Sequence, residues 1–193
     1  MKNIQEVFNE KTCYAFSDKA VDLKLLRRIY DVMKLGPTSA NSCPLRMVFV
    51  HSKEEKEKLY QCLSPGNIEK TKSAPITTIL AHDDEFYKKM TKLFPHSSDL
   101  MNKFAQSKEL AHNIAMQNSL LQAAYFMITA RGFGLQIGPM GGFNKDAINE
   151  KFFNDDSNWR VNFLCNLGYA KNHDNETSTK SPRLEFDETC KII

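Results

Sequence analysis

The chain has 193 residues, of which 41% are hydrophobic and 25% are charged. This length and composition are ordinary for one globular domain spanning residues 1–193, and a division into two domains is not expected. A net charge of +3 is too small to indicate a nucleic-acid partner, and no apolar run approaches the roughly 20 residues that cross a bilayer, so membrane proteins are also excluded.

Helices and strands are interspersed along the first half of the chain. Apolar spacing and turn residues predict helices at 4–9, 23–35, 53–63 and 84–93, strands at 47–50 and 76–81, and a basic, polar connector at 68–73. Asp22 and Ser52 stand where helix N-caps are expected, and Gly36 followed by Pro37 ends the second helix.

The strongest helix signal is the stretch 107–131, which contains no Gly or Pro and is rich in Ala, Leu, Met and Gln. Because apolar residues cover most of its circumference, this central helix is expected to be packed on all sides. Beyond it, the cluster from Gly138 to Gly142 would let the backbone approach a ligand closely. A helix at 144–153, a strand at 161–169, a polar loop at 171–181 and a packed tail at 182–193 complete an α+β fold.

Several familiar chemistries lack support in the sequence. Gly132, Gly134 and Gly138 approach the dinucleotide fingerprint, but that motif follows a strand and precedes a helix, and here the order is reversed. The five histidines and five cysteines show no metal-ligand spacing, so no metal site is expected. Cys43 lies in a loop without an evident partner base, which favours a structural thiol over a nucleophile.

The cysteine count and the first residues of the chain favour a cytoplasmic location. Five cysteines are an odd number, and reduced thiols in a cytoplasmic protein are the plain interpretation. The first residues lead directly into a helical pattern, so no signal peptide is expected.

Isolated cations and small polar loops remain. Taken singly, each is most often a solvated charge or a turn; taken together, they suit an anionic, planar cofactor with polar edges. They are Lys11-Thr12, Thr38-Ser39-Ala40-Asn41, Asn67-x-x-Lys70, Gly138 to Gly142, and Lys180-x-x-Arg183.

With these positions in view, the chain resembles the nitroreductase family of FMN-dependent oxidoreductases, and more narrowly its malonic semialdehyde reductase (3-hydroxypropionate dehydrogenase) branch. The resemblance covers essentially the whole chain in family order. It rests on GPTSANSCPLR (36–46), SPGNIEKTKSAP (64–75), DDEFY (83–87), LFPH (93–96), NSLLQAAY (118–125), GLQIGPMGGF (134–143), LGY (167–169) and PRLEFDE (182–188).

The resemblance implies a mixed sheet around a long central helix, an intertwined homodimer, and FMN bound at the interface. Lys11 and Thr12 would meet the FMN phosphate end, as would Lys180 and Arg183 from the tail. Glu10 and Tyr14 stand where the family usually has basic residues.

Around the flavin ring, the resemblance implies further contacts. Asn67 and Lys70 would address the pyrimidine edge, where a cation stabilises the negative charge of reduced flavin. The remaining implied contacts are Pro37, Thr38, Ser39 and Asn41 along the ring and ribityl chain, and Pro139, Met140, Gly141 and Gly142 against the ring. Many relatives have glutamate at the position of Gly141.

The implied reaction is a ping-pong transfer in which NAD(P)H delivers hydride to flavin and leaves, and an oxidised substrate is then reduced. The substrate implied by the branch is malonic semialdehyde, with 3-hydroxypropionate as the product. His96 and Tyr87 are the candidate proton donors, although a solvated loop histidine is an equal interpretation of His96. The alternatives are a general nitroreductase or quinone reductase, a flavin-binding protein with little turnover, and an unrelated α+β interaction domain.

Overall fold

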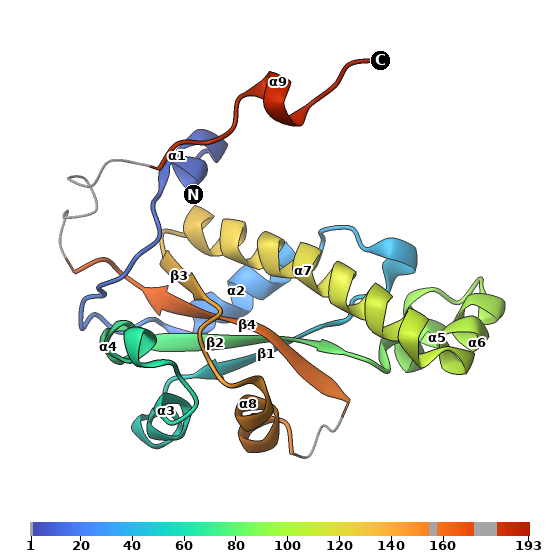
Figure 1. Cartoon of the computed structure of the whole chain (residues 1–193), viewed down its shortest axis with the longest axis horizontal. Helices are drawn as coiled ribbons and strands as arrows, with labels where there is room; N and C mark the ends of the chain where they lie inside the picture. The colour runs from blue at the N-terminus through green and yellow to red at the C-terminus, as the bar shows by residue number, and fades with distance from the viewer. Residues whose placement is uncertain (1, 155–157, 172–180) are drawn as a thin grey trace.

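A four-stranded sheet forms the centre of the computed structural model, which describes residues 2–154, 158–171 and 181–193. Its strand order is β1-β2-β4-β3, with β1 at Leu45–Val50, β2 at Ile76–Asp83, β3 at Gln136–Met140 and β4 at Trp159–Gly168. The α+β class with a long helix is confirmed (Figure 1). All three strand pairings are antiparallel, so the described residues contain no parallel strand of the kind that a mixed sheet requires.

Helices cover both faces of this sheet. In Figure 1, α2 and α7 lie above it and α3 and α8 below it. The helices are α1 (Ile4–Asn9), α2 (Leu23–Met33), α3 (Lys53–Tyr60), α4 (Pro65–Ser73), α5 (Met90–Leu93), α6 (Ser98–Gln106), α7 (Lys108–Gly132), α8 (Lys145–Phe152) and α9 (Phe186–Thr189), with 3₁₀ turns η1 (Ser39–Asn41) and η2 (Phe86–Lys89).

The two largest apolar clusters of the core lie on opposite faces of the sheet. Ile76 and Leu80 of β2 pack with Phe126 of α7, whereas Ile79 packs on the opposite face with Ile148 of α8. Every residue of β2 is buried, because both faces of this central strand are covered by helices.

The central helix is where the sequence predicts it, and Ser107 caps it by accepting a hydrogen bond from the Leu110 N–H group at 3.3 Å. It is not packed on all sides, however. Met116, Leu120 and Leu121 are 37%, 43% and 49% exposed within this chain. The expectation of complete burial is therefore wrong for the chain by itself, since no element of the described residues covers this face.

Three parts of the chain differ from the sequence-based prediction. The connector at 68–73 is instead the end of α4, which begins with Pro65 in its first turn, where proline is well tolerated. The helix expected at 84–93 divides into η2 and α5, and α6 was not anticipated. Most of the glycine cluster lies in β3, where a Cβ on Gly138 would stand 2.6 Å from the Cys13 carbonyl oxygen.

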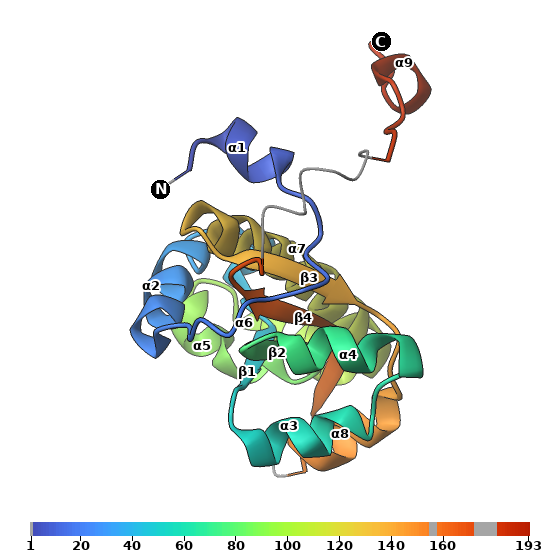
Figure 2. The same cartoon turned by 90° about the vertical axis from the view of Figure 1, so that its left-hand side faces the viewer.

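The described part of the tail extends away from the body of the chain (Figures 1 and 2). Leu184 and Phe186 are more than half exposed there. The packed tail that the sequence predicts is therefore not found within this chain, and most of the predicted loop at 171–181 lies outside the described residues. Among the helices of the described ranges, none has the length and apolar character needed to cross a membrane.

Candidate functional site

Six of the residues predicted to bind the cofactor come together where α4 meets the end of β3. Thr12, Lys70, Pro139 and Met140 line one small cavity, with Asn67 and Gly142 beside it. The cavity measures about 20 Å³, whereas pockets for drug-sized ligands are typically about 300–1,000 Å³. The cavity is therefore too small to enclose a flavin, and we call these six residues the α4–β3 group.

Hydrogen bonds fix the orientation of the Lys70 amine in the α4–β3 group. Asn67 Nδ2 donates to the Gly142 carbonyl oxygen at 2.8 Å, and Asn67 Oδ1 accepts from Lys70 Nζ at 3.4 Å. Lys70 Nζ also lies 5.0 Å from the ring centroid of Tyr14, within cation–π range. The three-residue spacing of Asn67 and Lys70 puts both on one side of α4.

The two neighbouring glycines differ in the space around them. A Cβ on Gly142 would stand 2.6 Å from Asn67 Nδ2 and 3.3 Å from Ser64 Oγ, whereas a Cβ on Gly141 would meet nothing within 4 Å. Gly142 therefore allows close packing inside the chain, and the exposed Gly141 leaves open space in front of it. That open space suits a flat ring approaching from outside.

The N-terminal segment brings Lys11 and Glu10 to the edge of β3. The Lys11 carbonyl oxygen accepts a hydrogen bond from Arg131 Nη2 at 3.1 Å. Burial raises the pKa of the Glu10 carboxyl, but hydrogen bonds from Lys2 and from Gln136 Nε2 (2.6 Å) outweigh it and hold this pKa below its usual value. Glu10 stands where the family usually has a basic residue, and its negative charge is thus compensated by partners within the chain.

The loop from Pro37 to Cys43 forms a second group, held by α7. Ala40, Asn41 and Cys43 have φ angles of 48°, 49° and 42°, a left-handed conformation that costs roughly 1–2 kcal/mol for each residue with a side chain. Such strain persists only where the surroundings enforce it, and it concentrates at functional sites.

Three α7 side chains enforce the conformation of this loop. Asn118 Oδ1 accepts from the Ser39 N–H group at 2.8 Å, and the Tyr125 hydroxyl donates to the Pro37 carbonyl oxygen at 3.1 Å. Gln122 Oε1 accepts from the Leu45 N–H group at 3.0 Å, where β1 begins. These residues had no predicted role, although polar side chains at positions i, i+4 and i+7 of an apolar helix are the signal that identifies them.

Both proposed proton donors lie at the same end of the molecule as this loop. Tyr87 packs against Phe86 with ring centroids 6.0 Å apart, in a cluster that includes Ala40. Asn41 Nδ2 donates to the Leu93 carbonyl oxygen at 2.9 Å, and the exposed His96 follows in the next turn of chain. We call this second set, from the Pro37 loop to His96, the α7-loop group.

The two groups lie at opposite edges of the sheet. The α4–β3 group adjoins β3, the edge strand beside β4, whereas the loop of the α7-loop group leads into β1, the other edge strand. Three strand spacings of about 4.8 Å separate these two edges by about 14 Å. One chain therefore provides two separate half-sites rather than one enclosed pocket.

The phosphate contacts expected from the tail are not assembled within this chain. Lys180 lies outside the described residues. Arg183 is exposed, and its Nη1 donates to the carbonyl oxygens of Ser181 and Pro182 at 2.9 and 3.0 Å. The structure therefore does not bring Arg183 to the α4–β3 group of its own chain.

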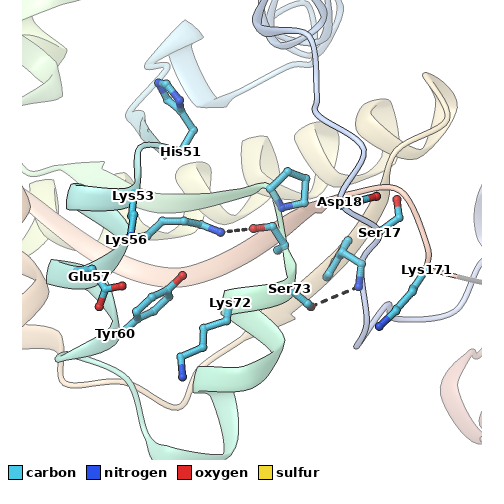
Figure 3. A pocket seen from close by; sticks show the side chains of 13 residues that line it. Ser17, Asp18, His51, Lys53, Lys56, Glu57, Tyr60, Lys72, Ser73 and Lys171 are labelled. Atoms are coloured by element: carbon cyan, nitrogen blue, oxygen red, sulfur yellow. Dashed lines mark hydrogen bonds between the residues drawn. The ribbon is translucent and has the colours of Figure 1, made fainter.

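A larger cavity, about 830 Å³, lies elsewhere, between the N-terminal segment, α3 and α4 (Figure 3). None of the predicted site residues lines it. Its most buried cation, Lys56, donates to the Thr71 carbonyl oxygen at 3.1 Å and also to that of Ala74, and burial lowers its pKa. Because this amine is committed to the chain itself, we consider the cavity secondary to the two half-sites.

Comparison with known sequences identifies the family. The profile described as the Nitroreductase family matches residues 9–169. The chain belongs to the nitroreductase family. A relative from Ralstonia nicotianae, provisionally named a NADH dehydrogenase/NAD(P)H nitroreductase, is 44% identical over 191 residues, which cover 98% of this chain and 96% of the relative.

Solved structures share the nitroreductase fold at lower sequence identity. A nitroreductase family protein from Streptococcus pneumoniae aligns with a TM-score of 0.82 and 24% identity, covering 98% of both chains. A protein from Exiguobacterium sibiricum, provisionally named a nitroreductase and solved in complex with FMN, aligns with a TM-score of 0.86 and 16% identity, covering 100% of this chain and 98% of that one.

Proposed function

We propose that the chain is an FMN-dependent NAD(P)H oxidoreductase that reduces a small aldehyde acid. The observation that supports this proposal is the pair of half-sites at opposite edges of the sheet: a hydrogen-bonded cation beside glycines at one edge and a strained polar loop at the other. Family membership supports the oxidoreductase class. The relatives' names and the FMN complex of the Exiguobacterium protein support the choice of cofactor and of NAD(P)H as reductant.

A homodimer would complete both sites. In a two-fold dimer, the α7-loop group of one protomer can face the α4–β3 group of its partner, so each site takes residues from both chains. The exposed apolar face of α7 at Met116, Leu120 and Leu121 supports such an interface. Lys180 and Arg183 would then reach the phosphate of a site from an extended tail.

The residues of the α4–β3 group suit an anionic flavin. When bound, FMN would supply hydride transfer between NAD(P)H and the substrate. Lys70 would stabilise negative charge at the pyrimidine edge, and Asn67 holds its amine in place for that role. Pro139, Met140, Gly141 and Gly142 would lie along the ring, and Lys11 and Thr12 toward the phosphate.

The α7-loop group would serve the other side of the ring and the substrate. Pro37, Thr38, Ser39 and Asn41 would line the ring and the ribityl chain. His96 or Tyr87 would deliver the proton that the carbonyl oxygen of an aldehyde needs when hydride reaches its carbon. The malonic semialdehyde substrate rests on the family branch that the sequence resembles, whereas the word nitroreductase in the relatives' names favours nitro compounds as the second candidate.

Flavin spectroscopy with three acceptors tests this proposal. We expect purified protein to absorb near 450 nm, to bleach with NADH or NADPH, and to regain colour with malonic semialdehyde at least about tenfold more efficiently, by kcat/KM, than with nitrofurazone or a quinone. A preference for nitrofurazone or quinone would contradict the aldehyde substrate. Yellow protein that neither nicotinamide bleaches would contradict the reductase activity, and protein that ignores added FMN would overturn the cofactor.

A further inference from the structure

Three metal-ligating side chains converge beyond the end of β2. His82 is the seventh residue of β2, Asp84 directly follows the strand, and His112 lies in the second turn of α7. His82 Nε2 is 3.4 Å from His112 Nδ1 and 3.3 Å from Asp84 Oδ1, and His112 Nδ1 is 2.9 Å from the same oxygen. Because 28 residues separate Asp84 from His112, no spacing in the sequence indicates this cluster.

These separations match the coordination shell of one small cation. Zinc bonds to imidazole nitrogen and carboxylate oxygen at about 2.0–2.2 Å, so two ligands of a tetrahedral site lie roughly 3.3 Å apart. All three separations in the cluster are within a few tenths of an ångström of that value. The backbone therefore presents the three side chains at ligand spacing without rearrangement.

A directed chain of hydrogen bonds fixes the tautomer of His82. Ser119 Oγ donates to the Met116 carbonyl oxygen at 2.8 Å, so it accepts from Asn162 Nδ2, also at 2.8 Å. Asn162 Oδ1 consequently faces His82 Nδ1 at 2.7 Å and accepts its proton. The lone pair of His82 is thereby on Nε2, directed at the cluster, which is the outer-shell arrangement that metal-ligating histidines typically have.

The cluster contains more hydrogen-bond acceptors than it has protons to donate to them. His82 Nε2 and Asp84 Oδ1 both present lone pairs across 3.3 Å, and His82 is only 3% exposed, so water cannot freely separate them. A single proton on His112 Nδ1 can be donated well to only one of the two acceptors. A cation held between the three atoms satisfies all of them at once.

The neighbouring charged side chains do not occupy the position between the three ligand atoms. The Arg160 Nε atom lies 3.7 Å from Asp84 Oδ2, so it interacts with the carboxylate oxygen that faces away from His112. Asp83 is engaged by Arg46 at 2.6 Å and does not compete as a ligand. The His112 side chain is 45% exposed and that of Asp84 27%, which provides an entry path and a position open to water.

We propose that His82, Asp84 and His112 bind one divalent transition-metal ion, with zinc preferred. Two neutral imidazoles and one carboxylate are a donor set that suits Zn²⁺ better than Mg²⁺ or Ca²⁺, which prefer oxygen alone. The ion ties the end of β2 to the N-terminal part of α7, and water completes its coordination. No member of this site is among the residues proposed to bind FMN, so the inference does not rest on the proposed function.

Equilibrium dialysis of the FMN-loaded, chelator-treated protein against Zn²⁺ tests the site, with bound metal measured by atomic emission. We expect one zinc ion per chain and a loss of affinity of about a hundredfold or more in His112→Ala, a substitution at a half-exposed ring that should leave folding intact. Asp84→Asn should weaken binding in the same direction. The matched control is His51→Ala, an exposed histidine outside the cluster, which should bind zinc as the parent protein does.

X-ray absorption at the zinc edge gives an independent measurement. Two imidazole ligands and oxygen neighbours in the parent protein support the site. The proposal is overturned if the parent protein binds no more zinc than His112→Ala, or if His51→Ala loses zinc equally. A spectrum with sulfur ligands also overturns it, because the cluster contains no cysteine.

Discussion

At Gly142 the chain has no room for a side chain. Its carbonyl oxygen accepts from both the Ser64 N–H group and Asn67 Nδ2, which draws the backbone against α4. Gly141, one residue earlier, faces open space. The two positions thus share a sequence context, but only Gly142 is packed against α4.

We predict that Gly142→Ala weakens FMN binding at least about tenfold, because the new methyl group would stand 2.6 Å from Asn67 Nδ2 and displace the partner of Lys70. Gly66→Ala is the matched control and should retain FMN, because a Cβ on this exposed glycine of α4 meets nothing within 4 Å and Gly66 is not among the proposed FMN contacts. Fluorescence titration of the flavin-free variants with FMN measures both. Equal affinities in the two variants would contradict the assignment.

Some members of the α4–β3 group could be singled out from the sequence because their signal is local. Asn67 and Lys70 stand three residues apart, and the glycine cluster is contiguous. Asn118, Gln122 and Tyr125 received no role, because their targets lie in a loop about eighty residues earlier in the sequence. His82 and His112 were missed for the same physical reason: only the packing of β2 against α7 brings them together.

The helix α4 is held in place by a side chain from the neighbouring helix α3. The α4 helix ends at Ser73, and the carbonyl oxygens of Thr71 and Ala74 at this end accept from the Lys56 amine of α3. Both accepting residues are essentially buried, so water cannot replace the amine. This contact anchors α4, and with it Asn67 and Lys70, relative to the sheet.

We predict that Lys56→Met lowers the free energy of unfolding by about 1–3 kcal/mol, because it leaves buried carbonyl groups without donors. Methionine is similar in volume to the lysine stem, so the packing changes little. Removing the buried charge recovers some desolvation free energy, but leaving the two carbonyl groups without a donor costs more. Urea unfolding followed by circular dichroism measures the change. Lys53→Met, at an exposed position on the same helix, should shift stability by less than about 0.5 kcal/mol; a comparable loss there would argue against the anchoring role.

Most elements were predictable from apolar periodicity and caps, as Asp22 and Ser52 illustrate by accepting from the N–H groups of Lys24 and Glu55. The strand β3 was not, because Gly138 and Pro139 both disfavour strands in isolation. Its place at the edge of the sheet explains the exception, since an edge strand tolerates a residue without an N–H group. The position of β3 in the sheet, rather than the local preference of its residues, therefore explains why it is a strand.

For the whole molecule, the unpaired half-sites and the uncovered α7 face point to the same assembly. We predict that Leu121→Lys, at a 49% exposed position, produces a folded monomer that has lost most of its flavin, because a charge in an apolar interface is strongly unfavourable. Light scattering after size exclusion and the flavin-to-protein absorbance ratio measure the two effects.

The control variant introduces a lysine on the opposite side of the sheet. Glu150→Lys lies at an exposed position on α8, below the sheet in Figure 1, and should remain dimeric and yellow. A Leu121→Lys protein that is monomeric yet fully loaded with FMN would mean that one chain binds the cofactor unaided.

The separation of the two groups across the sheet has a consequence for hybrid dimers. If each site combines the α4–β3 group of one protomer with the α7-loop group of the other, a protomer damaged only at Lys70 and a protomer damaged only at Asn118 are each inactive in pure form. Denatured together and refolded as a mixture, they would form hybrid pairs in which one site carries both lesions and the other carries neither. Recovery of activity from two inactive variants would show that each active site is formed by residues of both protomers.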